Sequence, residues 1–148
     1  MQQKCLLYWT SIFALIATSI ESSLSSGCGK SIPNNFSPDK TTTVKLRKTN
    51  DQPVRYYNVH LPVNYKNDRR HAIVFSFHGH TRNMYLQEDL SQLSEKGLLI
   101  NDSEIIAVYP QGIKGTDGGT AWQGAPYSNP HIDDVSYFTI IINIVILN

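Results

Sequence analysis

Two short apolar stretches decide the fold: residues 72–77 are Ala-Ile-Val-Phe-Ser-Phe, and residues 105–109 are Ile-Ile-Ala-Val-Tyr. Uncharged runs of β-branched and aromatic side chains are typical of strands that are covered on both faces. The sequence between them has apolar positions at helical spacing and a terminating glycine, at Leu86, Leu90, Leu93 and Gly97. A strand, a helix and a second strand predict a βαβ unit with two parallel strands.

An antiparallel hairpin is expected before this unit. Residues 41–46 alternate in the strand manner, residues 54–61 are rich in Tyr and Val, and turn-forming residues lie between them at Asn50, Asp51 and Pro53. The chain has 148 residues, of which 41% are hydrophobic and 17% charged, a globular composition of single-domain size. The expected fold class is therefore α/β, with a hairpin followed by a βαβ unit.

Charge and cysteine content exclude several classes of protein. The 13 Lys and Arg residues nearly balance the 12 Asp and Glu residues, so the formal net charge is +1 and no electrostatic case exists for nucleic acid as a partner. Two cysteines are too few for a disulfide scaffold or a thiolate zinc site.

The first residues have the pattern of a secretory signal peptide, assigned to residues 1–21. Residues 5–20 carry no charge, and a Ser-rich stretch follows them, so cleavage is expected between Thr18 and Ser26. The alternative is a membrane anchor, but the run is shorter than the roughly 20 residues of a spanning helix. The mature protein is therefore expected outside the cell and free of the membrane.

Export has consequences for three side chains. Cleavage removes Cys5 and leaves Cys28 as an odd thiol, which in an oxidising compartment needs a partner from another chain or from sequence outside this one. Asn35 and Asn101 begin glycosylation sequons, which suits export, although such triplets also occur by chance.

Parallel strands end at one rim of a sheet, where open α/β sheets bind their ligands. The segment that leaves residues 72–77 at this rim is His78-Gly79-His80-Thr81. A glycine after a buried strand allows consecutive amides to point at one spot, and such amides stabilise an oxyanion. The alternative is a plain turn from strand to helix.

A metal site is the weaker interpretation of the same histidines. His78 and His80 are joined in that interpretation by further ligands at His131, Asp133 and Asp134. No third ligand stands at diagnostic spacing, so no metal is expected. Asp133 and Asp134 are also a candidate carboxylate pair for acid/base work, but adjacent carboxylates before an apolar run more often cap a helix, which is the preferred interpretation.

The second rim segment, after Pro110, is a Gly-rich loop that leads to Trp122 and Tyr127. Aromatic side chains on such a loop form a stacking surface for a sugar or a phenolic ring. Alternatively, Trp122 packs on the core beneath the loop, and the two interpretations are compatible. The loop lacks the Gly-Lys-Ser/Thr run of a phosphate-binding P-loop.

Six motifs together resemble the secreted feruloyl esterases, which belong with the polyhydroxybutyrate-depolymerase-like esterases of the α/β-hydrolase superfamily. The resemblance covers about residues 27–138. The motifs are Gly27-Cys28-Gly29-Lys30, Arg55-Tyr56-Tyr57 before Leu61-Pro62, Phe77-His78-Gly79, Tyr109-Pro110-Gln111-Gly112, Ala121-Trp122-Gln123-Gly124 and Asp133-Asp134-Val135.

The resemblance implies a serine carboxylesterase that releases ferulic and related hydroxycinnamic acids from plant cell-wall polysaccharide, with no metal and no organic cofactor. It implies oxyanion-hole amides at Gly79, His80 and Thr81, an aromatic-acid pocket lined by Trp122 and Tyr127, and a later cysteine that pairs with Cys28. Such enzymes attack the ester with a Ser in a GxSxG elbow, assisted by a His and an Asp.

No GxSxG occurs in the 148 residues, so no catalytic residue is assigned. The resemblance therefore predicts the N-terminal half of an α/β-hydrolase fold with an incomplete sheet, inactive by itself. Residues 140–147 hold seven Ile, Val or Leu in eight positions, the composition of an aggregation-prone strand, so residues 139–148 are interpreted as a tail foreign to the family. Alternatives are an acetylxylan or polyhydroxybutyrate esterase, or a secreted carbohydrate-binding module without catalysis.

Overall fold

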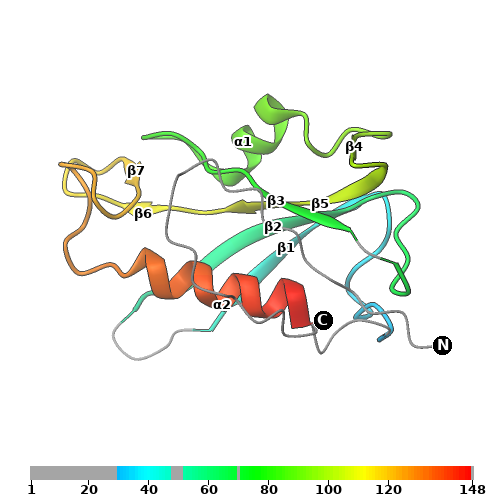
Figure 1. Ribbon diagram of the computed structural model, residues 1–148. Helices are drawn as coiled ribbons and strands as arrows, with labels where there is room; N and C mark the ends of the chain where they lie inside the picture. Colours follow the sequence, from blue (N-terminus) through cyan, green and yellow to red (C-terminus); the bar gives the residue numbers. More distant parts are fainter. Residues whose placement is uncertain (1–29, 48–51, 70, 148) are drawn as a thin grey trace, which may run out of the picture.

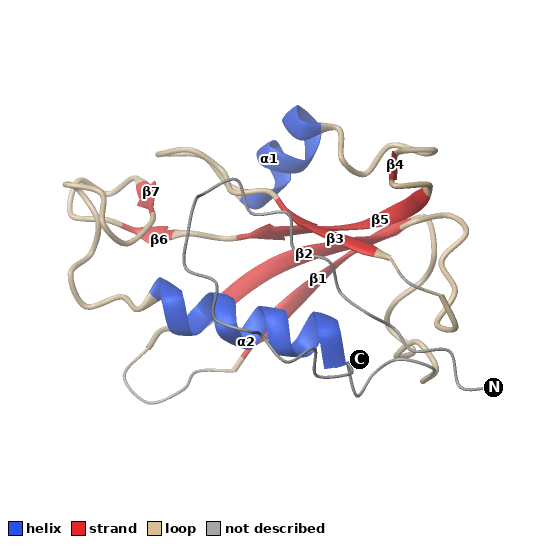
Figure 2. Ribbon diagram, viewed as in Figure 1, coloured by secondary structure: helices blue, strands red, loops and turns tan. Residues whose placement is uncertain are grey.

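The computed structural model describes residues 30–47, 52–69 and 71–147. They form an α/β structure in which a mixed sheet, with strand order β1-β2-β5-β3, carries a helix on each face (Figures 1 and 2). The main strands are β1 (Lys40–Leu46), β2 (Arg55–Leu61), β3 (Ala72–Phe75) and β5 (Ser103–Pro110). The helices are α1 (Met84–Ser91) and α2 (Asp134–Leu147). Two-residue strands are β4 (Leu99–Ile100), β6 (Ile113–Lys114) and β7 (Thr120–Ala121).

Both expected strand pairings are confirmed. β1 and β2 form an antiparallel hairpin, with Lys40 opposite Leu61. β3 and β5 are parallel, with Ala72 opposite Ile105, and α1 lies between them in sequence. Because β2 pairs antiparallel with β5, the sheet is mixed. The carboxyl ends of β3 and β5 therefore lie at the same rim of the sheet.

The core has two layers because alternate residues of a strand face opposite sides. Ile106 and Val108 of β5 belong to a cluster with Tyr137 and Ile141 of α2, whereas Ala107 and Tyr109 pack with Met84 of α1. β5 is thus covered on both faces, as its sequence predicts.

β3 is not the doubly covered strand that its sequence predicts. It has four residues, all half-buried, and Phe77 beyond its end is 44% exposed. β3 ends the strand order next to β5, so among the described residues it has one neighbour in the sheet. A strand with one neighbour lacks the cover that a central strand receives.

A helix forms where the sequence predicts one, at α1. The side of the helix that is buried and the residue at which the helix ends both differ from the prediction. Met84 is 4% exposed, whereas Leu86 and Leu90 are 41% and 54% exposed. At 3.6 residues per turn, these leucines lie on roughly the opposite side of α1 from Met84. The left-handed residue that ends the helix is Gln92, with φ of 57°, and not Gly97.

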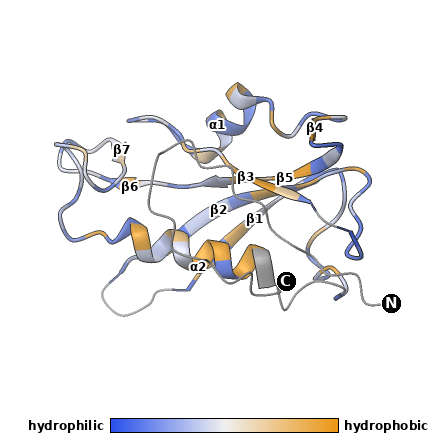
Figure 3. Cartoon of the chain, viewed as in Figure 1, coloured by the Kyte–Doolittle hydropathy of each residue, from blue (hydrophilic) through white to orange (hydrophobic). Residues whose placement is uncertain are grey.

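The apolar residues near the C-terminus are helical rather than extended. Asp133 precedes α2 and accepts hydrogen bonds from the Ser136 amide and hydroxyl at 3.0 and 2.5 Å. Its pKa is lowered by these two donors. The cap starts a helix whose Tyr137, Ile141 and Val145 recur every four residues against the sheet, and Figure 3 shows its hydrophobic character.

No helix within the described residues is long and apolar enough to cross a membrane. The expected signal peptide and Cys28 lie outside these residues, so the structure does not bear on them.

Candidate active site

His78 is the buried centre of the rim where the two loops meet, with 1% exposure. Its Nε2 accepts a hydrogen bond from the Gly112 amide at 2.9 Å. The proton of the neutral ring therefore lies on Nδ1, which is 2.8 Å from the Gly79 carbonyl oxygen. The indole of Trp122 donates to the His78 carbonyl oxygen at 2.8 Å. The loop after β3 is thus tied to the loop after β5, as the parallel strands predict.

Burial lowers the pKa of His78, and the nearby Arg55 charge lowers it further, while the Gly79 carbonyl opposes both. The ring is therefore neutral at neutral pH. Because both ring nitrogens are engaged within the protein, His78 positions the two loops and is not placed to act as a catalytic base.

The segment after His78 forms a turn in which the Arg82 amide donates to the Gly79 carbonyl oxygen at 3.2 Å. Thr81 has φ of 65°, and its amide donates to the Thr120 carbonyl oxygen at 2.9 Å. A positive φ is strained for a β-branched residue, so the surrounding contacts must hold it.

This geometry reduces the number of amides that can form the candidate oxyanion hole from three to two. The Thr81 amide is already engaged, whereas the amides of Gly79 and His80 make no hydrogen bond to another described residue. Gly79 is exposed and His80 is half-buried. The two consecutive amides are therefore free to donate to a ligand at the rim.

Two glycines in the second loop permit the close approach of the two segments. A Cβ at Gly112 would lie 2.8 Å from the Ala121 carbonyl oxygen and 3.0 Å from His78 Cε1. A Cβ at Gly119 would lie 2.8 Å from His80 Nε2 and 2.9 Å from Thr81 Cγ2. Side chains at these positions would push the loops apart.

His80 links the candidate amides to the Gly-rich loop. Its Nε2 lies 2.8 Å from Asp117 Oδ2, and its ring stacks on Tyr127 with 3.8 Å between centroids. The predicted binding residue Tyr127 therefore lies directly beside His80, one of the residues of the candidate oxyanion hole.

Trp122 packs mainly into the core, as the alternative interpretation of this residue predicts. Its ring lies edge-on to Phe77 at 5.5 Å and tilted against Phe138 at 5.6 Å. Its indole nitrogen is occupied by the His78 carbonyl oxygen. Trp122 is half-buried, so only the exposed part of its ring is accessible to a ligand.

Four of the six motifs that carry the resemblance contribute a residue to one polar network beneath the rim. Arg55 donates to Asp134 Oδ1 at 2.7 Å and to the Gln111 carbonyl oxygen at 3.1 Å. Asp134 Oδ2 accepts from the Gln123 amide at 2.5 Å, and the Gln123 side chain accepts from the Asp134 amide at 3.1 Å. The guanidinium group also lies 3.8 Å from the centre of the Tyr137 ring.

The sequence pattern indicates these residues only as members of motifs, and their joint role is visible only in the folded chain. The same pattern predicts that Asp133 and Asp134 both cap a helix. Asp133 does cap α2, but Asp134 is 3% exposed and pairs with Arg55. No sequence pattern marks this pairing, since Arg55 begins β2 and Asp134 begins α2, 79 residues later.

The structure does not bring the alternative metal ligands together. Asp134 is held by Arg55, Asp133 caps α2, and His131 is exposed. No group of three His, Cys, Asp or Glu residues in the described part of the chain is placed to hold a metal ion.

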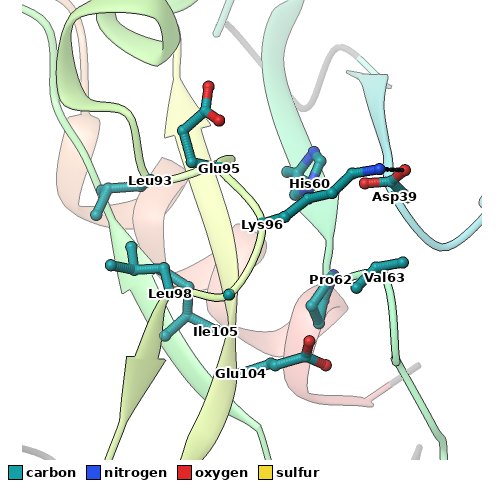
Figure 4. A pocket seen from close by; sticks show the side chains of 11 residues that line it. Asp39, His60, Pro62, Val63, Leu93, Glu95, Lys96, Leu98, Glu104 and Ile105 are labelled. Carbon is teal, nitrogen blue, oxygen red and sulfur yellow. Dashed lines mark ion pairs between the residues drawn. The ribbon is translucent and has the colours of Figure 1, made fainter.

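A separate shallow pocket lies near the amino end of β5, away from the rim (Figure 4). His60 of β2 and Ile105 of β5 line it, together with Leu98 and the exposed ion pair between Lys96 and Asp39, whose charged atoms are 2.8 Å apart. Its residues contact neither of the candidate amides.

No protein-family model matches the chain, and comparison with curated proteins finds no match. Any assignment of function therefore rests on the motifs and on the geometry of the rim.

Proposed function

We propose that this chain supplies the oxyanion-binding side of a secreted serine carboxylesterase of the feruloyl-esterase type. The observation that carries the proposal is the pair of unengaged amides at Gly79 and His80, on the loop between β3 and α1. In α/β-hydrolases the loop between the third strand and the first helix provides an amide of the oxyanion hole.

The rigid surroundings of these amides support the same proposal. A catalytic oxyanion hole works because its donors are already fixed where charge develops. Here the His78 ring holds the Gly79 carbonyl oxygen, the Thr120 carbonyl oxygen holds the Thr81 amide, and the Tyr127 ring stacks on His80. The antiparallel hairpin and the parallel β3–β5 pair agree with the N-terminal half of an α/β-hydrolase sheet.

In the proposed reaction, a serine hydroxyl attacks the ester carbonyl, and the carbonyl oxygen becomes the anion that the Gly79 and His80 amides receive. Collapse of this intermediate releases the sugar alcohol and leaves an acyl-serine, which water then hydrolyses to the free acid. The 148 residues contain no GxSxG, so the proposal places the serine in a longer product of the same gene.

Tyr127 supports an aromatic acid as the acyl group. Its ring is stacked on His80 and lies next to the amides, so a hydroxycinnamoyl ring attached to the bound carbonyl has an aromatic neighbour. The proposed substrate is therefore a hydroxycinnamoyl ester of plant cell-wall polysaccharide.

The oxyanion segment can be tested on the 148-residue chain. Titration of the ¹⁵N-labelled protein with ferulate should shift the Gly79 and His80 amide resonances, whereas the alcohol with the same ring should not. Gly79→Pro removes one of the two donors and should weaken the response of the remaining His80 amide, while Gly79→Ala keeps both donors because a Cβ there meets nothing within 4 Å. Equal responses to the acid and the alcohol would count against the proposal.

The complete activity is tested on messenger RNA and its product. A transcript that continues beyond the codon for Val135 into a GxSxG, and whose secreted product hydrolyses methyl ferulate, would support the assignment. Enzyme-like hydrolysis of methyl ferulate by the 148-residue chain would contradict it.

A further inference from the structure

Three consecutive apolar residues are exposed at β4, which lies on the side of the sheet that carries α1 (Figure 1). Leu98, Leu99 and Ile100 are 39%, 53% and 41% exposed, and we refer to residues 98–100 as the apolar ridge. Exposed apolar runs of this length promote association unless something covers them. The ridge includes β4, which pairs with the start of β5.

The residue that follows the ridge is Asn101, the first residue of the sequon Asn101-Asp102-Ser103. Asn101 and Asp102 form the tight turn between β4 and β5, with φ of 50° and 60°, a conformation that Asn and Asp tolerate. Asn101 is exposed, and its side chain makes no hydrogen bond to another described residue. Its amide nitrogen is therefore accessible at the tip of the hairpin, beside Ile100.

The other sequon, at Asn35, has no such neighbour. Asn35 is also exposed, but Phe36 after it is half-buried against the core. A glycan at Asn35 would therefore have no exposed apolar run beside it to cover. The two sites form an internal comparison.

We propose that Asn101 carries an N-linked glycan that covers the apolar ridge. The bond forms between Asn101 Nδ2 and C1 of the first sugar, while the bond from that sugar to a polyprenyl pyrophosphate donor breaks. The polyprenyl pyrophosphate is the leaving group, and the amide nitrogen loses one proton. The inference rests on the proposed secretion and not on the esterase chemistry.

The experiment is expression of the full chain, with its own leader or a standard one, in a eukaryotic secretory host. Peptide mass analysis of the exported protein should find a glycan on Asn101. Ser103→Ala should lose that glycan, and Ser103→Thr should keep it because Thr preserves the sequon. An exported protein with Asn101 unmodified would overturn the proposal.

The covering role is tested with a dye that binds exposed apolar surface, together with size-exclusion chromatography. Ser103→Ala should bind more dye and associate, whereas Ser37→Ala, which removes the other sequon, should not. Leu99→Ser in the Ser103→Ala background should reverse the increased dye binding and the association. If Ser103→Ala also lowers the amount of secreted protein, Leu99→Ser should restore it. Unchanged dye binding in Ser103→Ala, or no reversal by Leu99→Ser, would overturn the covering role. The glycan analysis and the dye binding do not depend on the ferulate titration, so the glycan proposal and the esterase proposal can fail separately.

Discussion

The guanidinium group of Arg55 lies 2.7 Å from the carboxylate of Asp134, and the two side chains are only 5% and 4% exposed. The pair joins the first residue of β2 to the first residue of α2. Arg55 also binds the Gln111 carbonyl oxygen, and Asp134 also binds the Gln123 amide. The pair therefore holds the start of the loop after β5, at Gln111, and its later part, at Gln123. The rim is therefore supported from below by one buried ion pair.

Arg55→Ala should lower the free energy of unfolding by about 3–5 kcal/mol, because it leaves the Asp134 carboxylate buried without its counter-ion. Urea unfolding of the two proteins measures the difference. Lys45→Ala is the control, since Lys45 is exposed on β1 and its loss should cost less than about 0.5 kcal/mol. Equal effects of the two substitutions would show that the pair contributes little.

Stability should fall as the pH is lowered below the ordinary histidine pKa of about 6.5. Burial lowers the pKa of His78 and also that of His60, where Glu88, Asp39 and Glu95 oppose the effect. The unfolded chain therefore binds protons that the folded chain does not, and this difference stabilises the unfolded state until the pH reaches the folded pKa values.

The expected slope is at most about 1.4 kcal/mol per pH unit for each histidine. Urea unfolding between pH 7.5 and pH 5 measures it, and His78→Gln should reduce it, because Gln does not titrate in this range. A slope that is unchanged in His78→Gln would contradict the assignment of a buried neutral ring.

The sequence was sufficient for the elements of the sheet that depend on local pattern. The alternation of β1, the β-branched run of β5 and the turn formers between β1 and β2 predicted the hairpin and the parallel pair. The parallel pair in turn placed the segment after His78 beside the one after Pro110. These inferences needed only periodicity and strand direction.

The long-range polar contacts could not be predicted in this way. Arg55 and Asp134 are 79 residues apart, and no periodicity marks two charges that meet only in the folded chain. The same holds for Glu88 of α1, which accepts hydrogen bonds from Asn58 at 3.1 Å and Ser94 at 2.8 Å. This carboxylate faces the sheet and helps to orient α1, so the leucine pattern indicated the wrong face.

Met84→Ala should therefore destabilise the protein far more than Leu90→Ala. Met84 is 4% exposed among Ala107 and Tyr109, and such truncations cost about 2–5 kcal/mol. Leu90 is 54% exposed, so its truncation should change stability by less than about 1 kcal/mol. Thermal unfolding of the two variants measures this difference in stability. A larger loss of stability in Leu90→Ala would show that the leucine side of α1 is the packed side.

Gly112→Ala should separate the two rim loops, whereas Gly79→Ala should not. A Cβ at Gly112 would lie 2.8 Å from a backbone oxygen, and overpacking of this kind costs about 1–3 kcal/mol. A Cβ at Gly79 meets nothing within 4 Å. Urea unfolding, with the Trp122 fluorescence as a local reporter, distinguishes the two. Equal stability of both variants would mean that the loops relax freely.

The close contact between His80 Nε2 and Asp117 Oδ2 should control the local order of residues 79–81, which hold the candidate amides, rather than global stability. Asp117 is 41% exposed, so Asp117→Asn should lower the free energy of unfolding by less than about 1 kcal/mol. The Thr81 amide donates to Thr120, within the loop that Asp117 holds against His80. Its hydrogen exchange should therefore become faster in Asp117→Asn, because the loop opens more often.

The matched control is Asp39→Asn, which breaks the similarly exposed ion pair with Lys96 near the other end of the sheet. That variant should leave the Thr81 exchange rate unchanged, because Asp39 contacts neither rim loop. His80→Ala should accelerate exchange at least as much as Asp117→Asn, since it also removes the stacking of His80 on Tyr127. If Asp39→Asn and Asp117→Asn accelerate the exchange of Thr81 equally, the effect is global. The contact between His80 and Asp117 then has no special part in holding the candidate amides.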